Sequence, residues 1–186
     1  AMGYRNLREC IRDLEAAKQL VRIDQPVDPY LEAAEIQRRV FRAGGPAIYY
    51  ARVKGCSFPM VSNLFGTMER VRYLFRDSLD SVARMVELGV DPTDAVRRPR
   101  LLLTAPWTAR FARPRLVRRG PALEAKTTLN QLPQLVSWPQ DGGAYITLPQ
   151  VYTEDPDRPG VAHSNLGMYR VQISGGKYEP FVEAGL

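Results

Sequence analysis

The sequence is poor in cysteine and histidine, with two of the former and one of the latter among 186 residues. Cys10 and Cys56 show neither the close spacing of a zinc site nor a disulfide framework, which predicts reduced thiols in or near the core of a cytoplasmic protein. Long apolar runs are also absent, so no segment reaches the roughly 20 residues of a membrane-spanning helix. The N-terminus lacks a basic segment followed by an apolar one, which argues against a secretory signal.

Acidic residues are in deficit: 20 Asp and Glu stand against 26 Lys and Arg, and the net charge is +6. The excess is concentrated in arginines between residues 97 and 119. One interpretation is a nucleic-acid-binding surface. The segment has no helix-turn-helix, zinc or RNA-binding signature, and its prolines interrupt any long basic helix. We therefore favour a solvated basic face or a surface that meets an acidic partner domain, and we expect no nucleic acid among the partners.

Residues 1–100 carry helical and strand patterns in alternation and predict a small α/β domain. Asn6 and Thr67 are placed to cap helices, and Asp28 with Pro29 is placed to begin another. The other expected elements are strands at 21–23, 47–54 and 60–65 and a helix around 82–88. The predicted order is helix-strand-helix-strand-strand-helix-helix.

The second half of the chain differs from the first in composition. Residues 101–121 form a linker rich in arginine and proline, and residues 122–186 are rich in strand patterns. Strands are expected at 122–129, 144–152 and 163–173. These strands are too few to close a barrel or a sandwich, and open edges are unstable alone. We therefore predict an α+β chain that is the N-terminal part of a longer protein. The competing interpretation is that these strands extend the sheet of the first domain.

The segment from Asn165 to Ile173 combines an amide, a glycine and a guanidinium within a strand-like alternation. Arg170 shares a face with Leu166 and Met168, where a guanidinium is rarely buried without an anionic partner. The functional interpretation is that Arg170 holds a substrate or cofactor anion through bidentate hydrogen bonds. The alternative is an edge strand with Arg170 in water.

Four segments of the chain, in this order, resemble the N-terminal part of the UbiD family of prenylated-FMN-dependent reversible decarboxylases. They are the run from Leu7 to Asp28, Asn63-Leu64-Phe65-Gly66, Trp138-Pro139-Gln140-Asp141-Gly142-Gly143-Ala144-Tyr145-Ile146 and Asn165-Leu166-Gly167-Met168-Tyr169-Arg170. The resemblance spans nearly the whole chain. It implies an N-terminal α/β domain followed by the first strands of a split β-barrel that binds the flavin.

The resemblance also implies roles for individual residues. Asn165 matches a ligand of the divalent metal, usually Mn²⁺, that joins the flavin phosphate to the protein, with K⁺ nearby. Met168, Tyr169 and Arg170 match residues that contact the flavin, and Arg170 is also the expected catalytic residue, facing the substrate carboxylate. His163 precedes the asparagine and is expected in a loop rather than at the metal.

Asn165 and Arg170 are five positions apart, so on a regular strand their side chains face opposite sides. We therefore predict that Asn165 precedes the strand or that a bulge near Gly167 turns the chain. Gly167 is then explained by the need to let the cofactor approach.

The resemblance implies a parent protein that decarboxylates an aromatic or α,β-unsaturated acid, with quinone biosynthesis as one setting, and that assembles as a homo-oligomer. The remaining metal ligands and the catalytic glutamates are expected beyond residue 186, so the chain alone should be inactive. One rival is a non-catalytic interaction or oligomerisation domain, which does not need residues 122–186 to be ordered. The less favoured rival is a basic nucleic-acid-binding protein, whose binding would depend steeply on salt.

Overall fold

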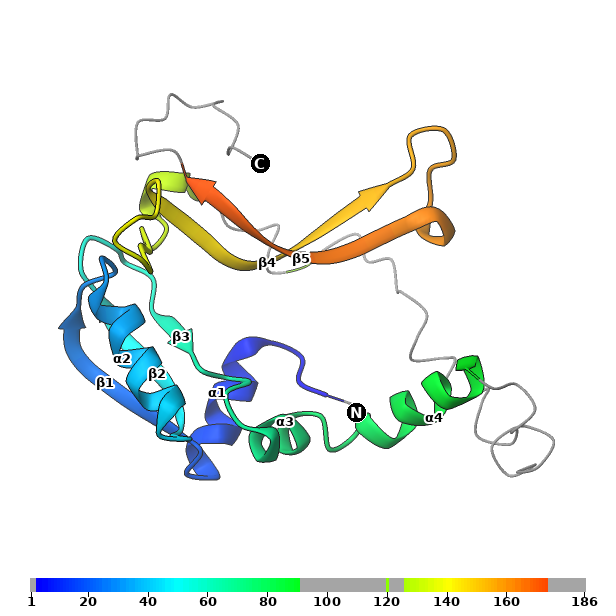
Figure 1. Cartoon of the computed structure of the whole chain (residues 1–186), viewed down its shortest axis with the longest axis horizontal. Coiled ribbons are helices and arrows are strands. Elements are labelled where there is room, and N and C mark those ends of the chain that lie inside the picture. The colour runs from blue at the N-terminus through cyan, green and yellow to red at the C-terminus, as the bar shows by residue number, and fades with distance from the viewer. Residues whose placement is uncertain (1–2, 91–119, 121–125, 174–186) are drawn as a thin grey trace.

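The structure is a computed structural model that describes residues 3–90, 120 and 126–173 (Figure 1). Its mixture of helices and strands confirms the predicted α+β fold class. A helix-rich N-terminal unit comes first, and a long β-hairpin arches beside it. The elements in chain order are α1 (Leu7–Ala16), β1 (Leu20–Val27), α2 (Glu32–Arg42), β2 (Ala47–Val53), β3 (Met60–Ser62), α3 (Met68–Leu74), α4 (Leu79–Val90), the 3₁₀ turn η2 (Leu129–Gln131), β4 (Ala144–Glu154), the 3₁₀ turn η3 (Val161–His163) and β5 (Ser164–Ile173).

Some predictions fall on residues outside those described. The arginine-rich segment between 97 and 119 lies there, and so do both expected domain boundaries, which stay predictions. The strand expected at 122–129 is wrong at its described end, because Leu129 begins η2. Among the described helices, none combines the length and the apolar character that crossing a bilayer requires.

Strand β2 is the centre of the N-terminal unit. The sheet order is β1-β2-β3, with β1 parallel and β3 antiparallel to β2. On one face of β2, Ala47 packs with Leu14 of α1. On the other face, Ile48 and Tyr50 pack with Ala33 of α2. Burial of each large side chain stabilises the fold by about 1.5–3 kcal/mol, which explains why β2 is apolar at successive positions.

Two helix caps form as the sequence predicts. The Asn6 side chain accepts a hydrogen bond from the Glu9 backbone N–H at 2.9 Å and begins α1. Thr67 Oγ1 accepts from the Arg70 backbone N–H at 3.2 Å and begins α3. Both interactions span three residues, so the local sequence is sufficient to specify them.

Helix α2 begins later than predicted. Its first residue is Glu32, and the preceding residue, Leu31, has a left-handed φ of 63°. Asp28 does not cap the helix; its Oδ1 accepts a hydrogen bond from the Tyr30 backbone N–H at 2.8 Å. The physical reason is a β-bridge between Tyr30 and Val136 in the second half of the chain, in which the Leu31 N–H donates to the Val136 carbonyl at 2.9 Å. A helix that began at residue 29 would remove this bridge.

The Asn63–Gly66 motif is a structural corner at the end of β3. The expected strand at 60–65 is too long, because Asn63 leaves it with a φ of 58°. Asn63 Nδ2 donates to the carbonyls of Gly45 and Pro46 at 3.3 and 2.9 Å. The buried Arg70 donates to the Asn63 carbonyl at 2.8 Å, and burial lowers the pKa of its guanidinium. The motif therefore serves the fold directly.

The hairpin of β4 and β5 forms its own two-stranded antiparallel sheet. Within the described residues, neither strand pairs with the sheet of the N-terminal unit, so the interpretation in which these strands extend that sheet is wrong. The two units meet instead at the Tyr30–Val136 bridge and where Cys56 Sγ lies 3.2 Å from the Gln131 carbonyl oxygen. Cys56 and the buried Cys10 are free thiols, as predicted.

Candidate functional site

All four predicted site residues lie on β5, and all four are exposed. Met168 is 65% exposed and Tyr169 48%, so large apolar groups face outward. The half-buried strand that the alternation predicts is found only at the end of β5, where Ile173 is fully buried. The reason is that the hairpin projects beyond the N-terminal unit, and no other described segment covers the 165–170 stretch.

The irregularity predicted between Asn165 and Arg170 is not found in β5, and the register shift of this hairpin lies on the partner strand. Asn165 is inside β5 and pairs with Thr153, so it does not precede the strand. The register shifts between Thr147 and Gln150, opposite the 168–170 stretch of β5, and places the extra residue in β4. A bulge on either strand increases the twist of both strands.

Gly167 has a local explanation. A Cβ atom at this position would lie 2.6 Å from a ring carbon of Tyr169, two residues away on the same face of β5. The aromatic ring therefore occupies the space that a larger side chain at Gly167 would need.

Arg170 is not free in water. The Nη1–Nη2 edge of its guanidinium is already bound to a carboxylate within the chain. Its Nη1 and Nη2 donate to Asp141 Oδ1 and Oδ2 at 3.1 and 2.6 Å. Its guanidinium also lies over the ring of Tyr145, 3.7 Å from the ring centre. The side chain is 39% exposed. The predicted bidentate pairing with an anion thus forms within the chain, and the hydrogen bonds with Asp141 raise the pKa of Arg170.

Asp141 is the residue of this site that sequence reasoning missed. Its Oδ2 accepts from the backbone N–H groups of Ser137 and Trp138, each at 3.0 Å, and its side chain is 8% exposed. The hydrogen bonds from Arg170 are the largest cause that lowers the pKa of Asp141, and the two backbone donors add to it. The available signal is that Asp141 is the one acidic residue in the motif from Trp138 to Ile146.

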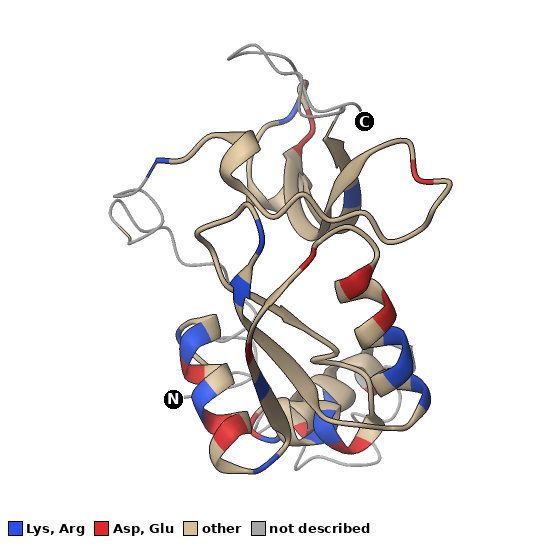
Figure 2. Ribbon diagram, turned by 90° about the vertical axis from the view of Figure 1, so that its left-hand side faces the viewer, with Lys and Arg blue, Asp and Glu red and all other residues tan. Residues whose placement is uncertain are grey.

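The hairpin is poor in charge. Each of its strands carries one charged residue, Glu154 on β4 and Arg170 on β5. Figure 2 shows charged residues spread over the helices of the N-terminal unit, whereas most of the hairpin ribbon is uncharged. The Glu154 carboxylate accepts from Tyr152 Oη at 2.6 Å and from the Gly160 N–H at 2.8 Å. Arg170 is therefore the cation to which an anion at β5 would bind.

A metal would need ligands from outside the described part of the chain. Within that part, no group of three or more His, Cys, Asp or Glu residues could hold a metal ion. Asn165 contributes one exposed amide oxygen, a ligand type that suits Mn²⁺. His163 ends η3, so it lies before the strand, as predicted. The residues present fit one part of a metal site and do not form a complete one.

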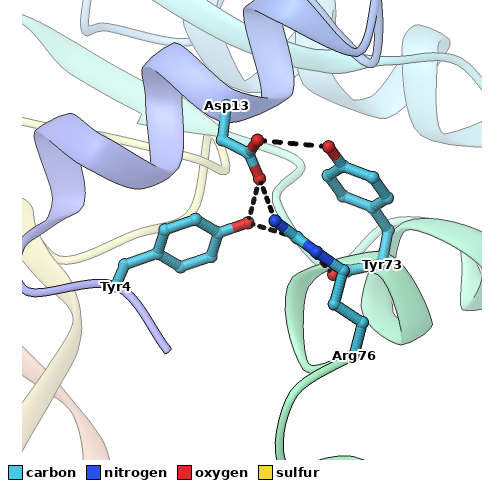
Figure 3. Close-up of polar contacts among 4 residues, drawn as sticks. All are labelled: Tyr4, Asp13, Tyr73 and Arg76. Atoms are coloured by element: carbon cyan, nitrogen blue, oxygen red, sulfur yellow. Dashed lines mark hydrogen bonds and ion pairs between the residues drawn. The ribbon is translucent and has the colours of Figure 1, made fainter. Parts of the chain in front are cut away.

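A second polar cluster lies in the N-terminal unit (Figure 3). Asp13 on α1 accepts hydrogen bonds from Tyr4 Oη at 2.5 Å, Tyr73 Oη at 3.2 Å and Arg76 Nη2 at 2.8 Å. Burial and the bond to Asp13 raise the pKa of Tyr4 to about 12, while the bond from Tyr4 is the largest cause that lowers the pKa of Asp13.

This cluster is a structural clamp rather than a reactive site. Its carboxylate already accepts three donors, and the guanidinium of Arg76 stacks 4.3 Å from the ring centre of Tyr73. The clamp joins the segment before α1, α1 itself and the end of α3. Perturbed pKa values accompany ion-pair networks of this kind as well as catalytic sites.

A cleft of about 560 Å³ separates α2 from the turn that holds Asp141. Its walls include Phe41 on α2 and the exposed Trp138 on the turn. The indole lies on the side of the turn that faces this cleft, while the carboxylate of Asp141 faces β5. The cleft and Arg170 are thus separate features on one short turn.

Comparisons with known proteins agree on one family. Residues 11–89 match the 3-octaprenyl-4-hydroxybenzoate carboxy-lyase N-terminal domain, and residues 115–181 match the Rift-related domain of the same enzyme. A protein of Chlamydia pneumoniae that is named for 4-hydroxybenzoate decarboxylase is 42% identical over 170 residues, which are 89% of this chain and 28% of the relative.

Solved structures give the same result. The closed form of vanillic acid decarboxylase from Sedimentibacter hydroxybenzoicus has a TM-score of 0.70 and 25% identity, covering 93% of this chain and 36% of that chain. An evolved dimeric form of the UbiD-class enzyme HmfF from Pelotomaculum thermopropionicum, in complex with prFMN, has a TM-score of 0.63 and 25% identity, covering 93% of this chain and 37% of that chain. The chain thus spans about a third of the length of these relatives.

Proposed function

The chain belongs to the UbiD family of carboxy-lyases, and on this premise we propose that the whole protein is a prenylated-FMN-dependent decarboxylase of an aromatic or α,β-unsaturated acid. The observation that carries the proposal is the exposed run of Met168, Tyr169 and Arg170 on β5. Exposed apolar side chains beside a fixed cation suit a ligand that is both planar and anionic. The solved UbiD-class relative in complex with prFMN supports the choice of cofactor.

Each of the four site residues on β5 would have its own role. Met168 and Tyr169 would pack against the flavin, and the Asn165 amide oxygen would be one ligand of Mn²⁺, with K⁺ alongside. Arg170 would hold the substrate carboxylate and fix its orientation. The cofactor, when bound, supplies the electron sink for the loss of carbon dioxide, while the protein binds, orients and excludes water.

Of the two substrate classes, we favour an aromatic acid with a ring hydroxyl. Two relatives are named for 4-hydroxybenzoate and for vanillic acid, and both of these acids are hydroxylated benzoates. A role in quinone biosynthesis and assembly of the whole protein as a homo-oligomer belong to the same proposal.

The test uses the whole protein loaded with prenylated FMN, Mn²⁺ and K⁺. We expect release of carbon dioxide from 4-hydroxybenzoate, and a loss of activity on the order of 100-fold or more in Arg170→Ala, because a misplaced reactant costs about that much. Arg158→Ala is the matched control, since Arg158 is an exposed arginine in the loop of the same hairpin. If neither 4-hydroxybenzoate nor an acrylic acid loses carbon dioxide, the proposed activity is wrong.

The chain of 186 residues provides a second arm of this test. It should release no carbon dioxide under the same conditions, because the catalytic glutamates and the other metal ligands are proposed to lie in the rest of the whole protein. Turnover by the chain alone would show that its own residues are sufficient.

A further inference from the structure

The Arg170 guanidinium is held by three contacts in two directions. Two parallel N–H···O bonds to Asp141 fix its position within its own plane. The ring of Tyr145, 3.7 Å from the guanidinium carbon, fixes the orientation of that plane. A planar fork bound at one edge and stacked on one face has little rotational freedom left.

Asp141 is itself immobilised by the backbone. The N–H groups of Ser137 and Trp138 both donate to its Oδ2, and the Asp141 N–H donates to the Trp138 carbonyl at 3.0 Å. The carboxylate therefore accepts four hydrogen bonds, two from the turn and two from Arg170. A side chain in this environment is a fixed support and not a group that moves.

A second tie joins the same turn to β5. Gln172 Nε2 donates to the Gly142 carbonyl at 3.0 Å. Gln172 and Arg170 are two residues apart, so they lie on one face of the strand. A Cβ atom on Gly142 would lie 2.9 Å from Gln172 Nε2. The turn therefore approaches β5 closely at the residue next to Asp141. The turn and this face of the strand are therefore built against each other.

We propose that Asp141 is a positioning residue, which occupies the Nη1–Nη2 edge of Arg170 and directs the remaining Nε–Nη2 edge toward the substrate carboxylate. This inference rests on the proposed function. A guanidinium carries five N–H donors, and its two edges can each bind one carboxylate. Among the described residues, no hydrogen-bond acceptor engages Nε. Arg170 can then donate two hydrogen bonds, from Nε and Nη2, to the substrate carboxylate. The orientation of these two donors is fixed by the pairing with Asp141.

The decisive experiment is a double-mutant cycle in the whole enzyme with Asp141→Asn, Arg170→Lys and the double variant. The asparagine turns an NH₂ group toward Arg170, and we expect kcat/KM to fall on the order of 100-fold. Because Asp141 acts through Arg170, Asp141→Asn should have little further effect in the Arg170→Lys background. Asp141→Glu, which keeps the charge, should recover part of the loss. Glu35→Gln breaks a similar bidentate pair with Arg38 on α2 and should leave kcat/KM unchanged.

The outcomes separate the two proposals. If the wild-type enzyme is inactive, the proposed function fails. If the wild type is active and Asp141→Asn equals it, or if the two losses multiply, the positioning role is wrong. Nitrogen-15 NMR of the chain alone gives a readout without activity: the Arg170 Nη groups should give separate signals in the wild type and averaged signals in Asp141→Asn. Averaged signals in the wild type would also overturn the inference.

Discussion

A Cβ atom on Gly66 would lie 1.9 Å from Asn63 Oδ1, far inside any possible contact distance. Gly66 therefore lets the Asn63 side chain reach the carbonyls of Gly45 and Pro46. The Asn63–Gly66 motif is one of the segments that carry the family resemblance. Its contacts show that it holds the end of β3 against the turn between α2 and β2.

Replacement of Gly66 by alanine should lower the free energy of unfolding by about 2–4 kcal/mol, because either Asn63 loses its buried hydrogen bonds or the corner shifts. Urea unfolding of the chain measures the change. Gly120→Ala is the control, since a Cβ there would meet no atom within 4 Å. Equal stability of the two variants would contradict this account of the motif.

Leu14→Ala should cost about 2–5 kcal/mol of unfolding free energy, because Leu14 is fully buried against β2 and its truncation leaves a cavity. Leu7→Ala removes the same atoms from the same helix at a position that is 52% exposed, and should change stability by less than about 1 kcal/mol. Thermal and urea unfolding of both variants check the difference. A small effect at Leu14 would mean that α1 does not pack on the sheet.

The clamp around Asp13 predicts how stability depends on alkaline pH. The pKa of Tyr4 is about 12 in the folded chain, above the value of about 10 for an unfolded tyrosine. The stabilisation from neutral Tyr4 is therefore complete below pH 10 and is lost as the pH rises through 12. Unfolding free energies measured from about pH 8 to 12 should fall more steeply for the wild type than for Tyr4→Phe. Identical slopes would show that Tyr4 does not bind Asp13 in solution.

Asn165→Ala should lower the Mn²⁺ content of the whole protein while leaving its unfolding midpoint unchanged, because Asn165 is exposed on β5. Metal analysis after dialysis measures the first quantity and thermal unfolding the second. Asn130→Ala, at an exposed asparagine in η2, should retain the wild-type metal content. Full Mn²⁺ retention in Asn165→Ala would remove this residue from the metal site.

The sequence predicts local features of this chain well and distant pairings poorly. The caps at Asn6 and Thr67 depend on residues three positions away, and both predictions are confirmed. The predicted start of α2 is too early because Leu31 bonds to Val136, which lies far along the chain in its second half. A helix-initiation pattern contains no information about such a partner.

The site shows the same limit. The chemistry of Arg170 predicts a bidentate anionic partner, but the identity of that partner depends on how the turn at Asp141 folds back across 29 residues. The spacing of Asn165 and Arg170 predicts an irregularity in β5 between them, and this prediction is wrong. The extra residue lies in β4, about which the spacing along β5 contains no information.

Strand β4 has one extra residue, around Leu148, compared with the stretch of β5 that it pairs with. Thr147 pairs with Arg170 and Tyr152 with Leu166, so an odd-numbered and an even-numbered residue of β4 stand opposite residues of one β5 face. Deletion of the extra residue would place Gln150 two positions from Thr147, just as Met168 is two positions from Arg170, so the distal pairs would keep their partners and the local twist added by the bulge would be lost. Homologous hairpins that lack this residue should therefore keep the same distal pairs and have a less twisted β4–β5 ladder.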